Sequence, residues 1–318
     1  MALTVVGSIA FDSVRTPFGE RDRMLGGSAV HFSQAASFFT EVRVVGPVGD
    51  DFGPDELGAL EGRGVSTDDI ERVEGGETFV WRGHYEYDMN VAHTDETQLN
   101  VFADFDPKLS AASRNAEMLF LGNIQPELQR RVRGESAARF SSLDSMNLWI
   151  ETERDSLVEA IGEVDCVLLN DAEIRELTGE PNLARAARAV MAMGPSVVVA
   201  KRGEYGAALF SDQGFFAIPG YLLEDVRDPT GAGDSFAGGF LGYLDGRRAA
   251  GASPQDPTAL RQAMAYGSVL ASFNVEDFGT ERVRSLTTEQ IEERLREFQR
   301  ITHFDVEAVS GATAGDRP

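Results

Sequence analysis

A repeated alternation of short apolar runs with amphipathic stretches constrains this fold more than any other feature of the chain. The apolar runs are β-branched and close to continuously apolar, which is typical of central strands in a parallel sheet. These runs are LTVVGSIA, VRVVG, MLFLG, ARFSSLD, VDCVLLN and SVVVAK. The helix-like stretches cover residues 29–39, 55–63, 155–162, 183–193, 257–273 and 288–300. Such βα units predict an α/β fold with a doubly wound, mostly parallel sheet flanked by helices.

Two segments interrupt this alternation. Residues 11–25 are polar and irregular, whereas residues 77–88 alternate aromatic with mostly polar side chains, as strands with one solvated face do. The chain has no internal repeat and no low-complexity linker. We therefore expect a single domain over residues 1–305 with a small antiparallel β lid, inserted at about residues 12–25 and 76–103.

The lid aromatics leave several interpretations open. Trp81, Tyr85 and Tyr87 suit packing within the lid or a dimer contact, whereas stacking of one of them on a base would make the ligand a nucleoside. Exposed sheet edges usually need cover, so a homodimer through the lid is a further expectation.

The two ends of the chain carry different expectations. The start, MALTVVGSIAFD, lacks a basic region and a small-residue cleavage site, so we expect a cytoplasmic protein. The last segment, VSGATAGDRP, is small and polar, which predicts a flexible C-terminal tail over residues 306–318.

The formal net charge of −23 limits the partners of the chain. It repels nucleic-acid phosphates and anionic lipids, so we expect no nucleic acid and no membrane as partner, but a small-molecule ligand. No apolar run approaches the ~20 residues that cross a bilayer. A single cysteine, Cys166, and four scattered histidines offer no spacing for a structural metal. Lysine occurs only at Lys108 and Lys201, which fits either G+C-rich coding or a salt-rich cytoplasm.

The segment DPTGAGDSFAGGF, residues 228–240, carries the strongest chemical signal. The small residues Gly231, Ala232 and Gly233 let the backbone approach a ligand, and the N–H groups of the helix that follows form an anion site. A phosphoryl group fits that site, while the carboxylate of Asp234 can accept the proton of a substrate hydroxyl. The alternative is structural, since Asp is a favoured N-cap and Gly-Ala-Gly an ordinary tight turn.

Two rival glycine motifs do not fit. The chain has no G-x-x-x-x-G-K-[ST], and the third glycine of a G-x-G-x-x-G starting at Gly231 would fall on Phe236. The first strand, VVGSIAFD, offers one glycine where a dinucleotide fingerprint needs several. These mismatches disfavour a dinucleotide-dependent oxidoreductase.

The same segment resembles the C-terminal signature of the ribokinase-like (PfkB-type) carbohydrate and nucleoside kinases. LGGSAVHFSQAA, residues 25–36, resembles their N-terminal diglycine signature, and the resemblance extends to about residue 304. It implies a ribokinase-like fold, with ATP and Mg²⁺ and, in many members, a monovalent cation such as K⁺. It also implies that Asp234 is the catalytic base and that Gly231, Ala232 and Gly233 form the anion hole.

The resemblance assigns further residues to the nucleotide and to ions. Asn170 and Glu173, in LLNDAEIRELTG, match an N-x-x-E motif that acts on the phosphates and on magnesium, which suits a water-mediated role of Glu173. The remaining matches are Lys201, Gly203 and Gly206 of a nucleotide-phosphate loop, Asn274 near the adenine, and Asp228 and Thr230 for the monovalent cation. For Lys201 alone, a solvated lysine at a strand end is the alternative.

On the acceptor side, Asp12, Gly26 and Gly27 match residues that hold substrate hydroxyls and hinge the lid. His31 stands where many sugar kinases have an asparagine, and the alternative is a hydrogen-bonded, half-buried histidine. Asp144 begins a D-x-N-x-R pattern whose arginine is missing. These departures argue against a standard ribose or fructose assignment.

The leading hypothesis is an ATP-dependent phosphotransferase that phosphorylates a hydroxymethyl-type hydroxyl of a small sugar or nucleoside. A lid that closes would exclude water, which competes with the acceptor. The alternative is a non-catalytic nucleotide- or sugar-binding sensor on the same fold, which has no chemical need for Asp234.

Overall fold

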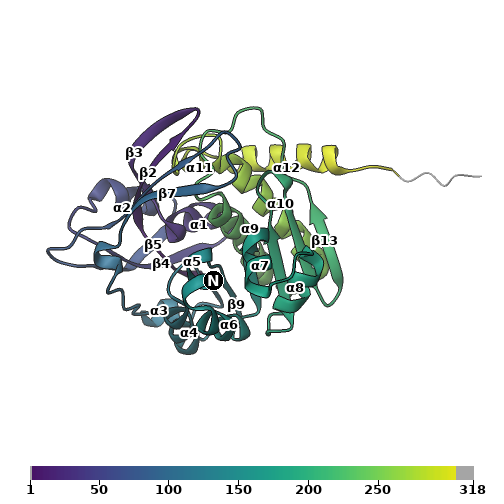
Figure 1. The fold of residues 1–318 in the computed structure, drawn as a ribbon, viewed down its shortest axis with the longest axis horizontal. Helices are drawn as coiled ribbons and strands as arrows, with labels where there is room; N and C mark the ends of the chain where they lie inside the picture. The colour runs from purple at the N-terminus through teal and green to yellow at the C-terminus, as the bar shows by residue number, and fades with distance from the viewer. Residues whose placement is uncertain (1, 306–318) are drawn as a thin grey trace, which may run out of the picture.

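A nine-stranded sheet in the order β13-β12-β11-β10-β9-β8-β1-β4-β5 forms the centre of the computed structural model (Figure 1). The structure describes residues 2–305, so the tail predicted over residues 306–318 lies outside the described residues. The strands from β11 to β5 pair in parallel. Six of them arise from the predicted apolar runs: β1 (Ala2–Val6), β4 (Glu41–Val48), β8 (Met118–Leu121), β9 (Phe140–Leu143), β10 (Cys166–Asn170) and β11 (Val197–Lys201). The predicted mostly parallel sheet is confirmed.

Three further strands extend the sheet at its edges. β5 (Val65–Arg72) reads VSTDDIER and lacks the apolar signal because an edge strand leaves much of its surface in solvent. At the opposite edge, β12 (Ala207–Ser211) and β13 (Gly214–Ile218) form an antiparallel hairpin. The sheet is therefore mostly, not wholly, parallel.

Helices cover both faces of this sheet, as predicted. Successive strand residues alternate between the two cores: Val5 belongs to one buried cluster and Val6 to the other. The first face carries α1 (Ser28–Ala36), α9 (Ala232–Ala249), α10 (Pro257–Asn274) and α12 (Thr288–Thr302). The second carries α4 (Pro126–Glu135), α6 (Arg154–Gly162), α7 (Asp171–Thr178) and α8 (Leu183–Met191). The shorter helices are α2 (Pro54–Glu61), α3 (Ala111–Arg114), α5 (Asn147–Thr152) and α11 (Glu281–Arg284), with 3₁₀ turns η1 (Asn100–Phe102) and η2 (Gly203–Tyr205).

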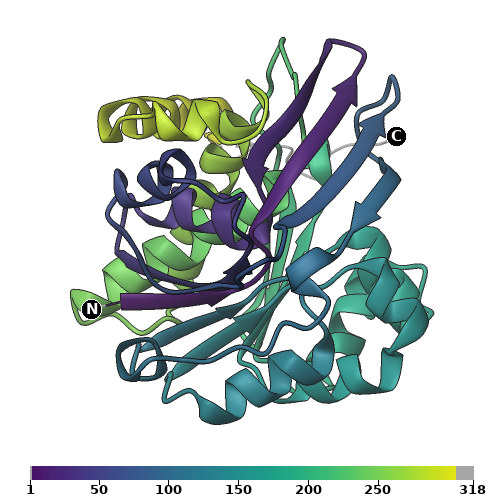
Figure 2. The same cartoon turned by 90° about the vertical axis from the view of Figure 1, so that its left-hand side faces the viewer.

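A second, four-stranded sheet projects from the large one (Figure 2). Its order is β3-β2-β6-β7, with bounds β3 (Gly19–Gly26), β2 (Ala10–Thr16), β6 (Phe79–Tyr85) and β7 (Ala92–Gln98). Its strands fall close to the segments at which the lid was expected. We refer to it as the small sheet.

Three details of this region differ from the sequence-based expectation. Residues 11–25 are not irregular, because most of them form the β2–β3 hairpin, with a register shift between Asp12 and Val14. Residues 100–102, within the segment expected for the β lid, form the 3₁₀ turn η1. The central pair β2–β6 is parallel, whereas the outer pairs are antiparallel. Because β1 and β5 end at the same edge of a parallel array, β2 and β6 both start there and run in the same direction.

Candidate active site

Three predicted site residues meet at the carboxyl ends of adjacent strands of the large sheet. Asp144 directly follows β9, Asn170 ends β10 and Lys201 ends β11. Asn170 and Lys201 are direct partners in the sheet register. Ligands of doubly wound sheets bind beyond the carboxyl ends of the strands, so this edge is where a site is expected.

The signature loop, residues 228–234, leads into the start of α9. Gly231 caps this helix with φ 72°, in the left-handed region, and no side chain caps the helix start. A Cβ atom at position 231 would lie 2.3 Å from ring atoms of His31. Both backbone conformation and space therefore require glycine here. Asp234 is the third residue of the first turn, whose N–H groups and dipole favour an anion.

Lys201 connects the strand ends to this helix start. Its ammonium group forms an ion pair with Asp144, and a Cβ atom at Gly233 would lie 3.2 Å from its Nζ. Burial by itself lowers the pKa of Lys201, but the carboxylates of Asp144, Glu173 and Asp234 outweigh burial and raise the pKa. A charged lysine thus lies beside the anion-favouring first turn of α9.

Two carboxyl groups near Lys201 hold their protons more tightly than usual. Burial raises the pKa of Asp234 to about 7, with the charge of Asp144 acting in the same direction and Lys201 against it. Burial also raises the pKa of Glu173 to about 7, again with help from Asp144. A carboxyl group with a pKa near neutrality is suited to exchange a proton with a substrate hydroxyl.

Asp12 lies on β2 with 6% of its surface exposed, and the diglycine folds around it. The N–H of Gly27 donates to Asp12 Oδ2 over 3.3 Å, and a Cβ atom at Gly26 would lie 2.0 Å from that oxygen. Burial raises the pKa of Asp12 to about 7, and the nearby charges of Asp228 and Asp234 add to the shift. The structure therefore brings Asp12 close to the signature loop.

Tyr85 also reaches the signature loop, which the alternating pattern of the lid did not predict. Thr230 Oγ1 donates to its hydroxyl over 3.2 Å. Tyr85 is buried with Val14 and Phe278, and the partly buried side chains Met24, Trp81 and Met89 pack against them. Trp81 is the register partner of Asp12. An apolar surface on the small sheet therefore lies next to Asp12. The hydrogen bond between Tyr85 and Thr230 could not be predicted, because it depends on tertiary packing and not on the alternating pattern of the strand.

The structure places two predicted contact residues inside the protein rather than at a ligand surface. Asn274, expected near the adenine, is 1% exposed, and its amide bonds to Thr230, Ser235 and His31. His31, expected to contact the substrate, is 2% exposed and lies under Gly231. The adenine role of Asn274 does not fit, because its hydrogen-bonding groups are used by the chain. For His31, the hydrogen-bonded alternative describes its surroundings better.

The N-x-x-E motif forms a capping box at the start of α7. Asn170 Oδ1 accepts from the N–H of Glu173 over 2.8 Å, and Glu173 Oε2 accepts from the N–H of Asn170 over 2.7 Å. Reciprocal caps of this kind fix the first turn of a helix. The motif therefore has a structural role that holds Glu173 near Lys201.

Asp228 is fully buried and braces the signature loop. Its Oδ1 accepts from the N–H of Thr230 over 2.9 Å, and its Oδ2 accepts from the N–H of Gly279 over 3.0 Å. Burial raises its pKa, against these hydrogen bonds. Gly279 contributes only its backbone N–H to this contact, so nothing in the sequence indicated its role.

The predicted phosphate loop after β11 contains the turn η2 between Arg202 and Gly206. Gly203 has φ 54° and Gly206 φ 88°. The tip of the β6–β7 loop contacts this turn, where Asn90 Nδ2 donates to Glu204 Oε1 over 3.1 Å. Asn90 was not expected at the site, since a polar residue at a loop tip is usually solvated.

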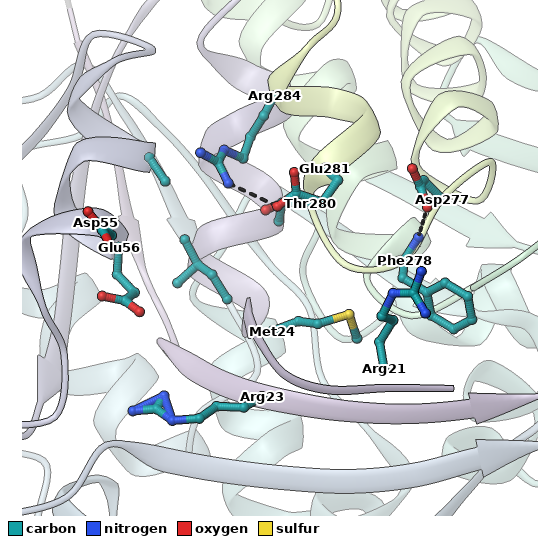
Figure 3. A pocket seen from close by; sticks show the side chains of 12 residues that line it. Arg21, Arg23, Met24, Asp55, Glu56, Asp277, Phe278, Thr280, Glu281 and Arg284 are labelled. Atoms are coloured by element: carbon teal, nitrogen blue, oxygen red, sulfur yellow. Dashed lines mark hydrogen bonds and ion pairs between the residues drawn. The ribbon is translucent and has the colours of Figure 1, made fainter. Parts of the chain in front are cut away.

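A polar cavity of about 520 Å³ lies beside β3, between α2 and α11 (Figure 3). Both acidic and basic side chains line it, and Arg21 lies over the ring of Phe278. None of the predicted site residues lines this cavity.

Within residues 2–305, no three His, Cys, Asp or Glu side chains are grouped closely enough to hold a metal ion by themselves. Over the same residues, no helix combines the length and apolarity needed to cross a membrane.

Fold and site together define a class: an α/β phosphotransferase with an acid at the start of a glycine-rich helix. The family model for pfkB family carbohydrate kinases matches residues 20–286. The chain belongs to this family. It is an ATP-dependent kinase of a sugar or nucleoside, and kinases of this family use ATP with Mg²⁺. The predicted family and ribokinase-like fold are confirmed.

Two curated relatives are nucleoside-type kinases. A cytidine kinase from Thermococcus kodakarensis is 31% identical over 254 residues, which cover 77% of this chain and 89% of the relative. A nucleoside kinase from Methanothermobacter thermautotrophicus is 27% identical over 299 residues, covering 88% and 91%.

Solved structures share the fold at lower identity. A nucleoside kinase from Burkholderia thailandensis in complex with inosine has a TM-score of 0.74 and 19% identity, covering 94% of this chain and 98% of its own. An E. coli structure holding ATP and Mg²⁺ has a TM-score of 0.72 and 18% identity, covering 94% and 99%.

Proposed function

We propose that this chain transfers the terminal phosphoryl group of ATP to the hydroxymethyl hydroxyl of a nucleoside, with Asp234 as general base. The observation that carries the proposal is the position of Asp234 in the first turn of α9, beside Lys201 and with a pKa of about 7. At neutral pH such a carboxyl group can take up the proton that the hydroxyl loses. The nearby N–H groups and the ammonium of Lys201 stabilise negative charge on the phosphoryl oxygens.

A nucleoside is favoured over a simple sugar by two features. The curated relatives above are named for cytidine and for nucleosides. In this chain Met24 on β3 and Trp81 on β6 are the register partners of Asp12 on β2, and both pack with Met89 of the β6–β7 loop in the cluster that contains Tyr85. In the proposal, Asp12 accepts hydrogen bonds from ribose hydroxyls, while the apolar surface faces the base.

The nucleotide-side residues suit a magnesium nucleotide without a preformed metal cage. Glu173 and Asp144 provide carboxylates near Lys201. Magnesium often keeps several waters and is held through one or two carboxylates and substrate phosphates. In the proposal, Glu173 orients water on the metal while Asn170 holds Glu173 in place. The ion supplies charge neutralisation when bound.

Two further assignments belong to this proposal. The backbone-braced carboxylate of Asp228, with Thr230, supports the signature loop, and K⁺ would bind beside it. The exposed edge strand β7, together with Tyr87 and Val91, which are 90% and 55% exposed, would be covered in a homodimer. Light scattering at working concentration tests the dimer, and a monomeric mass would contradict it.

Replacement of the base tests the reaction directly. We expect Asp234→Asn to lower kcat by about 10²-fold to 10⁴-fold, because general base catalysis contributes on that order. ATP binding, measured by calorimetry, is expected to persist. Asp155→Asn is the matched control, since Asp155 is an exposed acid in the first turn of α6. Turnover of Asp234→Asn near that of the wild type would remove the proposed base.

An acceptor panel tests the substrate class. Cytidine, adenosine and inosine should yield monophosphates with ATP, whereas ribose, fructose, inositol and 2-keto-3-deoxygluconate should react more slowly. Faster reaction of a free sugar would replace the nucleoside assignment. Tight binding of nucleotide and nucleoside with no product from any acceptor would favour the sensor alternative.

A further inference from the structure

The side-chain amide of Asn274 joins the two sides of the turn that opens α9. Its Nδ2 donates to the carbonyl oxygen of Thr230 over 2.7 Å, and its Oδ1 accepts from Ser235 Oγ over 3.0 Å. Thr230 and Ser235 flank the segment from Gly231 to Asp234. One buried amide, on the last residue of α10, therefore constrains both ends of that segment.

His31 makes the third contact of this amide. Its Nδ1 lies 3.0 Å from Asn274 Oδ1. Because Nδ2 faces a carbonyl oxygen, which only accepts, the orientation of the amide is set and Oδ1 must face His31. The amide oxygen Oδ1 of Asn274 can only accept a hydrogen bond, so His31 Nδ1 must carry the hydrogen and donate it. Burial lowers the pKa of His31 to about 4, so the ring is neutral at physiological pH.

The ring of His31 also forms the floor under Gly231. A Cβ atom at position 231 would lie 2.3 Å from Cγ and Nδ1 of the imidazole. The His31 ring therefore both contacts Gly231 and forms the hydrogen bond with Asn274. His31 Nε2 is buried and has no partner among the described residues, so the Nδ1 bond is the only one that orients the ring there.

From these contacts we infer that His31 and Asn274 form a positioning pair, which holds the first turn of α9 so that its N–H groups and Asp234 face the reacting atoms. The inference rests on the proposed function. His31 acts through Asn274 and Gly231 and exchanges no proton. Displacement of a reacting group by about 1 Å can cost about 10²-fold in rate, so a loss of this support should appear in kcat.

Substitutions at His31 separate the hydrogen bond from the ring. His31→Asn keeps an N–H at the same distance along the side chain as Nδ1 but removes the ring. His31→Phe keeps the ring and removes the N–H, and His31→Ala removes both. We expect kcat to fall by about 10-fold or more in His31→Ala, with smaller losses in the other two. The KM values for ATP and for the nucleoside should stay within about threefold, because a positioning residue does not bind either substrate directly.

Asn274→Ala should match His31→Ala in kcat, and the double variant should lose less than the product of the two single effects, since both act through one unit. Gln34→Ala is the control: it removes another buried amide from α1, one that donates to Ala59 O. A folded His31→Ala enzyme with wild-type kcat would overturn the inference. A rise in the nucleoside KM at constant kcat would also overturn it, because it would make His31 a substrate contact.

A measurement without turnover separates this inference from the proposed function. In ¹⁵N-edited NMR of the nucleotide-free protein, the His31 ring, assigned by its loss in His31→Asn, should show the Nδ1–H tautomer from pH 6 to 8. An Nε2–H tautomer or a charged ring would contradict the pair even if the enzyme proved active. An inactive wild type with the expected tautomer would instead count against the proposed function alone.

Discussion

At the scale of single residues, the site depends on acids kept at the edge of ionisation. Asp12, Glu173 and Asp234 each have a pKa raised to about 7, in every case chiefly by burial. Lys201 is the cation that lowers the pKa of both Glu173 and Asp234. Without ligands, the site therefore holds more negative than positive charge above neutral pH, which favours the entry of a cation.

The raised pKa of Asp234 predicts how activity depends on pH. As the proposed general base, Asp234 must be deprotonated to act, so kcat/KM should rise as pH increases through about 7 and then level off. The apparent pKa belongs to the coupled acids rather than to Asp234 alone. Initial rates from pH 5 to 9 with saturating Mg²⁺ measure it; a flat profile across pH 6 to 8 would contradict it.

The same shift has a consequence for stability. The pKa of Asp234 is higher in the folded state than the ordinary value of 3.8, so its contribution to folding is present at low pH and lost as pH rises through about 7. Asp234→Asn should therefore raise the Tm of the nucleotide-free protein at pH 8, with a difference that shrinks toward pH 5. Scanning fluorimetry at both pH values tests this, and an equal or lower Tm at pH 8 would count against it.

Gly231→Ala should damage the loop through two effects. The new methyl group meets the His31 ring at 2.3 Å, and φ 72° strains a residue with a side chain. We expect a loss of stability of about 2 kcal/mol or more and a large loss of kcat. Gly58→Ala in α2 is the control, because a Cβ atom there has no neighbour within 4 Å. Equal Tm values for the two variants would refute this account.

At the scale of elements, the starts of two helices hold the acidic side chains of the candidate site in place. The capping box of α7 fixes Glu173, and the left-handed cap of α9 fixes Asp234. Both helices begin next to strand ends of the large sheet: Asn170 ends β10, and Lys201, which ends β11, lies against Gly233. α7 follows β10 directly, whereas the longer segment 219–231 leads from β13 to α9; both connections place their helix start at the same edge of the large sheet.

Glu173→Gln separates the cap from the charge. Glutamine also serves at this position of a capping box, so Tm should change little at pH 5, where a pKa of about 7 leaves Glu173 protonated in the folded protein. Loss of the carboxylate should raise the Mg²⁺ concentration needed for half-maximal activity by several-fold, on the order of one charge-assisted interaction. Asn170→Ala is the contrasting variant, expected to cost about 1 kcal/mol of stability through loss of the cap. An unchanged Mg²⁺ requirement in Glu173→Gln would remove the proposed link to the metal.

Strands with a strong apolar pattern could be predicted from the sequence. Strands whose position depends on their neighbours in the fold could not. The apolar runs became central strands because burial on both faces leaves little room for polar residues. β5 escaped prediction because seven of its eight residues are half-buried or exposed, and the β2–β6 pairing depends on strands far apart in the chain. Likewise, the signature motifs located Asp234 and Lys201, whereas the burial of His31 and Asn274 depends on how α1 and α10 pack around α9.

At the scale of the whole molecule, 52 acidic and 29 basic residues give a formal charge of −23. The acidic surface includes β7, whose residues AHTDETQ are all exposed. Such an excess destabilises the compact state through self-repulsion, and salt screens it. The charge bears on stability and on partners rather than on the fold.

We expect Tm to rise by several degrees, on the order of 5 °C, between 0.05 and 1 M salt. NaCl, KCl and choline chloride should act alike on Tm if screening alone operates. A selective effect of KCl on kcat, absent with choline, would support a cation beside Asp228 and Thr230. A Tm that falls with all three salts would contradict the screening argument.

The bond between Asn90 and Glu204 bears on the order in which products depart. It ties the tip of the β6–β7 loop to the turn after β11. If the phosphorylated nucleoside leaves by outward movement of the small sheet, that movement also breaks this contact with the predicted nucleotide-phosphate loop. Departure of the two products is then coupled, so we expect an ordered kinetic sequence rather than independent release.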